Sequence, residues 1–219
     1  MIDIEKWTSE FCAALENTFR NRVLFIGLQG SYSRGEATDK SDIDMVVILD
    51  KLDYSDVQRY SDMLDTLTHR ELCCGFLSCR EDLAKWDVPD LFQLFHDTAA
   101  LRGDLGSLIP EITDEDVVRA IKTGLCSIYH ICVHNSLYGR KERTLKNLYK
   151  SASFVIQAIV YRETGEFVRT QRELLERAGD SEKPIISEFI RLKKGGEADL
   201  AALSELLFDW VRYRLNDLG

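Results

Sequence analysis

The chain has 219 residues, of which 45% are hydrophobic and 30% are charged, so it is long enough for one large domain or two small ones. Its formal net charge is −9, and no block of Lys or Arg offsets this charge. A polyanion such as duplex DNA would be repelled over most of such a surface, so we expect no nucleic-acid partner and a smaller substrate.

The N-terminal segment does not resemble a secretory signal. Residues 1–19 carry charges inside their apolar pattern and lack a basic segment followed by an uninterrupted apolar one. No stretch of the sequence reaches the roughly 18 apolar residues that span a bilayer. We therefore expect a cytoplasmic protein with no membrane partner. The six cysteines show no paired spacing typical of zinc sites, so free thiols are expected.

The first half of the sequence predicts alternating helices and strands. Apolar residues at helical spacing predict helices over residues 4–20 and 53–70. Short apolar runs predict strands over residues 22–30, 42–49 and 71–78, and the second of these is rich in β-branched residues. This order of elements is typical of folds that combine a sheet with flanking helices.

The second half of the sequence is almost entirely helical. A boundary is expected near Pro110, because Asp114 then precedes a long helical pattern. Glycines divide the pattern into predicted helices over 115–137, 141–164, 166–178, 182–194 and 198–216. We therefore predict an α+β fold, with a small sheet flanked by helices in residues 1–110 and an all-α bundle in residues 111–219.

Two carboxylates stand where the strand over residues 42–49 begins. Because alternate strand residues share a face, Asp42 and Asp44 should project side by side while Ile43 turns into the core. Carboxylates this close repel each other unless a cation lies between them, and Mg²⁺ accepts one or two carboxylates together with water and phosphate oxygens. The pair predicts a metal-nucleotide site, although an isolated Asp-x-Asp is more often a turn or a cap.

A second set of residues precedes the pair. Gly30 lets the backbone approach a ligand without a Cβ clash, and N–H groups of the following turn, with the Ser31 hydroxyl, can hold phosphate oxygens. Arg34 adds a positive charge that either meets a phosphate or pairs with Asp39 or Asp42. The glycine turn followed by the aspartate pair, in this order, indicates a metal-nucleotide site more specifically than either feature alone.

The segment "GSYSRGEATDKSDID", residues 30–44, resembles the signature of the DNA polymerase beta nucleotidyltransferase superfamily. It is most similar to small bacterial members that include the aminoglycoside (kanamycin-type) nucleotidyltransferases, and the resemblance is specific over about residues 23–50. It implies a nucleotidyltransferase sheet followed by a helical bundle that helps to shape the acceptor pocket.

The resemblance also implies a third metal ligand. In the family a later strand supplies it, and Glu71 stands at the matching place, with an exposed strand-end glutamate as the structural alternative. Together with Asp42 and Asp44 it would hold two Mg²⁺ ions. The implied reaction is an in-line attack on the α-phosphorus of an NTP, with release of pyrophosphate.

Other candidate residues rest on weaker signals. A general base for the acceptor is expected among carboxylates, and Asp104 is named ahead of Glu142 and Glu163. Lys146 and Lys150, four residues apart on one helix face, are candidates for contact with the triphosphate. For all five side chains a solvated surface position is the structural alternative.

The leading hypothesis is a transferase that moves a nucleoside monophosphate from an NTP to a hydroxyl of a small molecule, with an antibiotic among the options. The alternatives are a nucleotidyltransferase that modifies a protein partner, as antitoxins of this class do, and a non-catalytic nucleotide-binding module. An acceptor pocket completed by a second subunit is compatible with the resemblance, so a homodimer stays open. The acceptor and the preferred nucleotide leave no motif.

Overall fold

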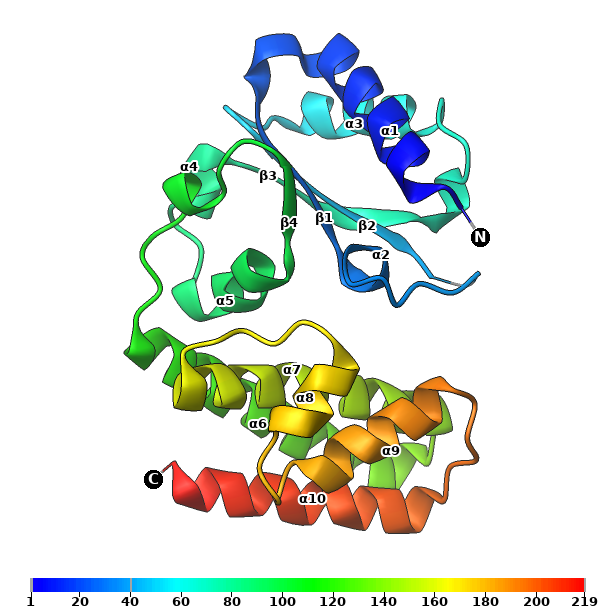
Figure 1. The fold of residues 1–219 in the computed structure, drawn as a ribbon, viewed down its shortest axis with the longest axis vertical. Coiled ribbons are helices and arrows are strands. Elements are labelled where there is room, and N and C mark those ends of the chain that lie inside the picture. Colours follow the sequence, from blue (N-terminus) through cyan, green and yellow to red (C-terminus); the bar gives the residue numbers. More distant parts are fainter. Residues whose placement is uncertain (1, 40, 219) are drawn as a thin grey trace. The chain divides into compact units, whose positions relative to one another are not determined.

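The computed structural model describes residues 2–39 and 41–218 (Figure 1). The chain divides into two compact units, unit 1 (Met1–Glu111) and unit 2 (Ile112–Gly219). The division falls one residue from the boundary expected between residues 110 and 111.

Unit 1 is a mixed four-stranded sheet with helices on both faces, which confirms the predicted α+β fold (Figure 1). The strand order is β3-β2-β1-β4, in which β1 runs antiparallel to β2 and β4, and β2 runs parallel to β3. The elements are α1 (Ile4–Phe19), β1 (Val23–Gln29), α2 (Gly30–Ser33), β2 (Ile43–Leu49), α3 (Tyr54–Leu64), β3 (Cys73–Cys79), α4 (Arg80–Leu83), α5 (Val88–Asp97) and β4 (Ala99–Arg102).

The central strand β2 is buried on both faces. Ile43, Met45 and Val47 belong to the core under α1 and α3, whereas Val46 and Ile48 belong to the core on the α4 and α5 side. Figure 1 shows these helix pairs on opposite sides of the sheet. Because alternate residues of a strand share a face, Asp44 lies on the same side of β2 as Val46 and Ile48, toward α5.

The structure differs from the sequence-based prediction at several elements of unit 1, including the four-residue helix α4, which was not predicted. The helix predicted over residues 53–70 ends at Leu64. Turns follow it, and His69 has a positive φ of 60°, which a helix cannot accommodate. Helix α5 and strand β4 were not predicted. Strand β4 is only four residues long and mostly exposed, so it shows no alternation of apolar residues.

Unit 2 is a bundle in which α6 packs against α7 and α10, and α7 packs against α9. Its first helix begins at a capping box, in which Thr113 and Asp116 each accept a hydrogen bond from the other's backbone N–H. The elements are α6 (Asp114–His134), the π-helical turn η4 (Asn135–Gly139), α7 (Glu142–Thr164), α8 (Gln171–Arg177), α9 (Lys183–Lys193) and α10 (Leu200–Asp217).

Within residues 2–39 and 41–218, no helix combines the length and the apolar character that crossing a bilayer requires.

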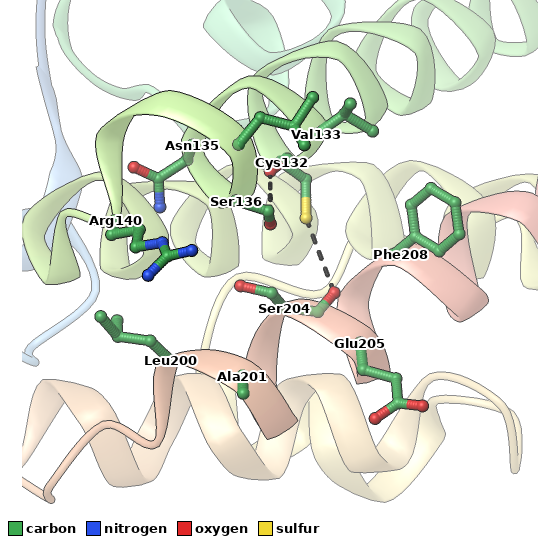
Figure 2. Close-up of a pocket in the computed structure, with 11 residues that line it drawn as sticks. Cys132, Val133, Asn135, Ser136, Arg140, Leu200, Ala201, Ser204, Glu205 and Phe208 are labelled. Atoms are coloured by element: carbon green, nitrogen blue, oxygen red, sulfur yellow. Dashed lines mark hydrogen bonds between the residues drawn. The ribbon is translucent and has the colours of Figure 1, made fainter.

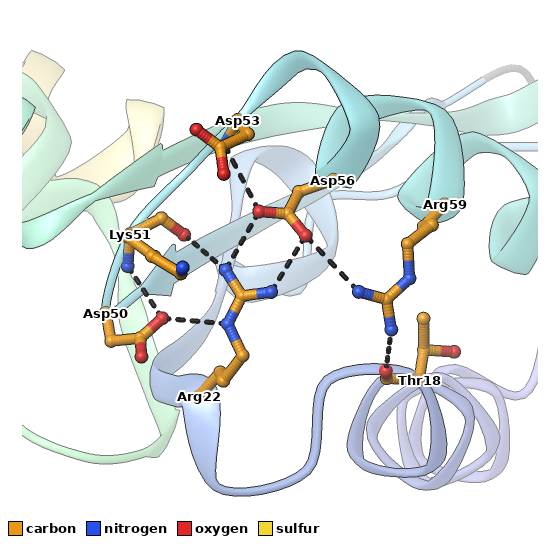
Figure 3. Close-up of polar contacts among 7 residues, drawn as sticks. All are labelled: Thr18, Arg22, Asp50, Lys51, Asp53, Asp56 and Arg59. Atoms are coloured by element: carbon orange, nitrogen blue, oxygen red, sulfur yellow. Dashed lines mark hydrogen bonds and ion pairs between the residues drawn. The ribbon is translucent and has the colours of Figure 1, made fainter.

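An ion-pair network around the buried carboxylate of Asp56 joins the start of β1 to the end of β2 and the first turn of α3 (Figure 3). The Arg22 guanidinium donates to both carboxylate oxygens of Asp56 at 2.8 Å and to Asp50 Oδ1 at 3.0 Å. Arg59 Nη1 adds a contact of 3.3 Å to Asp56 Oδ1. The hydrogen bonds from Arg22 hold the pKa of the Asp56 carboxyl well below its usual range.

Unit 2 has a comparable buried carboxylate at the start of α9. Burial opposes ionisation of Glu182, but hydrogen bonds from Arg214, Trp210 and Ser181 outweigh it, so the pKa of this carboxyl lies below its usual value. Trp210 Nε1 donates to Glu182 Oε1 at 2.9 Å, and Arg214 Nε donates to the same atom at 2.6 Å. The network joins α10 to the turn before α9.

Candidate active site

The two aspartates lie at the end of the sheet where β2 begins. Asp42 is exposed and directly precedes β2, and Asp44 is the second residue of the strand and half-buried. In the sheet register Asp44 is opposite Gln29 at the end of β1 and beside Cys74 on β3. Asp42 lies just outside β2, so its position on the same side as Asp44 stays a prediction from strand alternation.

Gly30 is the residue against which the Asp44 carboxylate packs. A Cβ atom at this position would overlap Oδ2 of Asp44. Gly30 also has a φ of 71°, a conformation that L-residues with side chains rarely adopt. The glycine is therefore required twice, for the turn from β1 into α2 and for the approach of the carboxylate to the backbone.

Replacing Gly30 with Ala is expected to lower the stability of unit 1 by about 1–3 kcal/mol, because the backbone is strained and the new methyl group displaces Asp44. The nucleotidyl transfer expected from the sequence should fall by about 10-fold or more, since the carboxylate predicted to hold the metal is moved. Gly35→Ala is the matched control, because Gly35 has a φ of 70° but open space where its Cβ would lie. Equal transfer rates in both variants would contradict the role of the Gly30–Asp44 contact.

Helix α2 is a single turn that begins at Gly30. Its carbonyls accept from the backbone beyond it, with Arg34 N to Gly30 O at 3.3 Å and Glu36 N to Ser31 O at 2.8 Å. The first N–H groups of a helical turn have no carbonyl partner within it and suit an anion. The Ser33 hydroxyl is buried and has no hydrogen-bond partner among the residues that the structure describes. No pattern in the sequence indicated it.

Arg34 is held by carboxylates. Its Nη1 atom donates to both carboxylate oxygens of Asp97, at 2.8 and 2.6 Å, and its Nε atom lies 3.6 Å from Glu36 Oε2. The Arg34 and Asp97 side chains are only 12% and 7% exposed. The pair connects α2 to the last residue of α5 and fixes the turn beside Asp44. Asp97 was not named from the sequence, because 63 residues separate it from its partner.

Glu71 lies at the same end of the sheet as the aspartates. It belongs to a 3₁₀ turn, Arg70–Leu72, which precedes β3, and the β2–β3 register starts with Ile43 beside Cys73. Its side chain is 73% exposed, with Oε1 at 3.9 Å from His69 Nδ1. In the described part of the chain no three His, Cys, Asp or Glu side chains are grouped closely enough for a metal ion. The structure thus does not bring Glu71 together with the aspartate pair.

Asp104 lies beyond the far end of β4. Ala99 pairs with Leu28 and Arg102 with Ile26, so the chain after β4 runs away from the Asp44 end of β1. Asp104 Oδ1 accepts a hydrogen bond of 3.0 Å from the Gly106 N–H, which stabilises a local turn. This placement argues against Asp104 as the general base.

Lys146 and Lys150 belong to α7 in unit 2. Lys146 Nζ forms an ion pair of 2.6 Å with Glu142, one of the other carboxylates considered as a base. Lys150 Nζ lies 6.0 Å from the centre of the Phe154 ring. These contacts are local to unit 2, and contact of either lysine with a triphosphate stays a prediction.

The family comparison matches the region that contains the aspartates. Residues 14–83 match the family described as polymerase beta, nucleotidyltransferase. A curated protein of Methanocaldococcus jannaschii, MJ0604, which carries the provisional name protein adenylyltransferase, is 46% identical over 46 residues. That match covers 21% of this chain and 46% of MJ0604, so less than half of the relative is represented.

The structural comparison extends over both units. The crystal structure of spectinomycin adenyltransferase AAD(9) from Enterococcus faecialis, with ATP and spectinomycin, is similar with a TM-score of 0.61. The likeness covers 95% of this chain and 99% of that one, at 14% sequence identity. At that identity the likeness is one of fold.

Proposed function

We propose that the chain, whose residues 14–83 form a polymerase beta nucleotidyltransferase domain, transfers a nucleoside monophosphate from an NTP to a hydroxyl group and releases pyrophosphate. The observation that carries this proposal is the packing of the Asp44 carboxylate against the Cβ-free backbone of Gly30. A non-catalytic nucleotide-binding module would not need both Asp42 and Asp44, so their presence favours an enzyme.

We propose Mg²⁺ as the metal, held by Asp42 and Asp44. Glu71 is not grouped with the pair in the structure, and it would become the further ligand of a two-ion site by a turn of its exposed side chain toward the pair. The residues fit this ion, because Mg²⁺ is bound through one or two carboxylates and keeps its other positions for water and phosphate oxygens. Oδ2 of Asp44 occupies the position that a Cβ atom of residue 30 would take, so the carboxylate lies directly against the backbone of the turn. Bound there, the ion would supply positive charge for the triphosphate.

The residues of the chain itself have separate tasks in this proposal. The N–H groups of Gly30 and Ser31 bind phosphate oxygens, and the Arg34–Asp97 pair keeps α2 in place on α5. The acceptor oxygen forms a bond to the α-phosphorus while the bond between this phosphorus and the bridging oxygen breaks. Pyrophosphate leaves with the electron pair, and the acceptor proton passes to a base that we do not assign.

ATP is the proposed donor, because the names of both relatives describe adenylyl transfer. The proposed acceptor is a hydroxyl of a small molecule rather than of a protein. The likeness to AAD(9), whose structure contains spectinomycin, extends over almost the whole chain, helical unit included. The match to MJ0604 is confined to 46 residues and therefore cannot include both units.

The test is pyrophosphate release with each NTP and Mg²⁺ across spectinomycin, aminoglycosides, lincosamides and simple polyols. Release that depends on one acceptor, and is absent in an Asp42→Ala, Asp44→Ala double variant, would support the proposal. Transfer of label from α-labelled ATP to a protein, with no response to small molecules, would favour the second candidate function. Gel filtration of the same preparation would test the homodimer.

Replacing Glu71 with Gln is expected to lower transfer by about 10-fold or more and to raise the Mg²⁺ concentration needed for half-maximal rate. The reason is that the amide is a poorer ligand for a hard cation than the carboxylate. Glu81→Gln is the control, since Glu81 is similarly exposed and paired locally, with Lys85 at 2.6 Å. If both variants keep the wild-type rate and Mg²⁺ dependence, Glu71 is not a metal ligand.

A further inference from the structure

A cavity of about 720 Å³ lies within unit 2, between the end of α6, the turn η4 and the first half of α10 (Figure 2). Its volume falls in the range of roughly 300–1,000 Å³ that is typical of small-molecule sites. The apolar part of its wall comes from Val133, Leu137, Leu200, Ala201 and Phe208. A pocket of this composition suits a ligand with an apolar body.

The backbone at one end of the cavity is unusual. The π-helical turn η4 interrupts the continuation of α6, and Arg140 follows it in the left-handed conformation, with φ 46° and ψ 38°. Asn135, which is buried, fixes this segment: its Oδ1 accepts from Lys141 N at 3.0 Å, and its Nδ2 donates to Lys141 O at 3.3 Å. Both features have an energetic cost and are found frequently at functional sites.

This conformation presents the Arg140 guanidinium to the cavity. Figure 2 shows it turned into the space between η4 and α10, on the side of Leu200 and Ser204. Arg140 is exposed, and among the residues that the structure describes its guanidinium has no hydrogen bond or ion pair. In the same part of the chain six other arginines of unit 2 are paired with carboxylates: Arg119 with Asp116, Arg162 with Asp114, Arg172 with Glu176, Arg177 with Glu166, Arg191 with Glu188 and Arg214 with Glu182.

Glu205 also lines the cavity but does not neutralise Arg140. Figure 2 shows its carboxylate pointing away from the guanidinium, and no ion pair joins the two in the described part of the chain. The wall thus has one positive charge at the η4 end, a carboxylate elsewhere and apolar side chains between. A ligand with a single negative charge at one end complements this distribution, whereas a second negative charge would approach Glu205.

We propose that this cavity is a binding site for a small monocarboxylate with an apolar body. The carboxylate lies against Arg140, with the Ser204 hydroxyl as a further donor, and the apolar body packs against Leu200, Ala201 and Phe208. Arg suits this role because its guanidinium binds a carboxylate through two parallel hydrogen bonds. The site does not involve Asp42 or Asp44, so it stands independently of the proposed transfer reaction.

The test is calorimetric titration of the full-length protein with decanoate, at concentrations below those at which it forms micelles. We expect saturable one-to-one binding that Arg140→Asn weakens by at least about 10-fold, as for loss of a charge-assisted contact. Asn is chosen because it adopts the left-handed conformation readily, so the backbone is kept. Decanol, which lacks the carboxylate, should bind the wild type as weakly as decanoate binds Arg140→Asn. Arg143 is an exposed arginine outside the cavity, so the Arg143→Asn variant should bind decanoate like the wild type.

A second variant separates the cavity from other apolar surfaces. Ala201→Trp keeps Arg140 and fills the space in front of it, so decanoate binding should be lost. Circular dichroism checks that each variant is folded, and Arg140→Asn decides alone if Ala201→Trp is not. The proposal is overturned if decanoate shows no saturable binding, or if its affinity is the same in the wild type and in Arg140→Asn.

Discussion

Replacing Asp44 with Asn is expected to lower the rate of nucleotidyl transfer by at least about 1,000-fold while unit 1 stays folded. The amide has the same shape as the carboxylate and can keep the packing against Gly30, so the change removes charge rather than volume. Without that charge, the site loses a ligand for the cation and a fixed negative group where the metal-nucleotide binds. A loss of this size distinguishes a catalytic carboxylate from a capping one.

The measurement is pyrophosphate release at saturating Mg-ATP with the acceptor found in the panel, and circular dichroism reports on the fold. Asp62→Asn is the matched control, because Asp62 is an exposed aspartate on α3, which covers the face of the sheet opposite to Asp44. A rate within a few-fold of the wild type in Asp44→Asn would remove the carboxylate pair from the mechanism. It would also return Asp42 and Asp44 to the structural alternative of a strand-end cap.

The parts of the fold that could be predicted are those encoded by local patterns. The apolar runs of β1 and β2 and the helical spacing of α1 are clear sequence signals, because these elements are buried on one or both faces. The alternation along β2 likewise assigns Asp44 to one face of the sheet, whereas Asp42 precedes the strand and its place on the same side stays a prediction. Strand β4 is mostly exposed and pairs only along one edge of the sheet, so its sequence carries little signal.

Contacts between distant parts of the sequence could not be predicted. Arg34 was expected either to meet a phosphate or to pair with Asp39 or Asp42. Its partner in the structure, Asp97, comes from α5, an element absent from the prediction. Similarly, the neighbour of Asp44 on β3 depends on strand register, which the spacing of residues does not determine. The register places Cys74 beside Asp44 and leaves Glu71 in the turn before β3. This is why Glu71 requires a separate test.

The same reasoning applies to Gly30, which was predicted to let a ligand approach the backbone without a Cβ clash. The approach of a ligand stays a prediction, and the structure adds two roles that were not predicted: the positive φ and the contact with Asp44. The overlap that a Cβ atom would make with Asp44 arises only because β2 pairs with β1 in a register that brings Asp44 opposite Gln29. The phosphate-binding turn and the metal-binding carboxylate proposed for this site are therefore one packed unit.

Replacing Asp56 with Asn is expected to lower the unfolding free energy of unit 1 by about 3 kcal/mol at pH 7, since it leaves the half-buried Arg22 without its main partner. Asp56 is only 3% exposed, and its two carboxylate oxygens accept hydrogen bonds of 2.8 Å from the two terminal nitrogens of Arg22. Asp65→Asn is the matched control. The Arg70–Asp65 pair has a similar distance of 2.9 Å but side chains 41% and 64% exposed, so its loss should cost less than about 1 kcal/mol.

In acid, the difference in unfolding free energy between Asp56→Asn and the wild type should disappear. The folded-state pKa of Asp56 is depressed, so its contribution is complete above the unfolded value of about 3.9 and is lost as pH falls toward the folded value. The difference in unfolding free energy between the two proteins should stay constant from pH 7 to about pH 5 and become smaller below about pH 4. Amide hydrogen exchange in peptides of β2 and α3 measures this for unit 1 alone, which matters because the chain has two compact units. If the difference in unfolding free energy is small at pH 7, or grows in acid, the Arg22–Asp56 pair does not stabilise the fold.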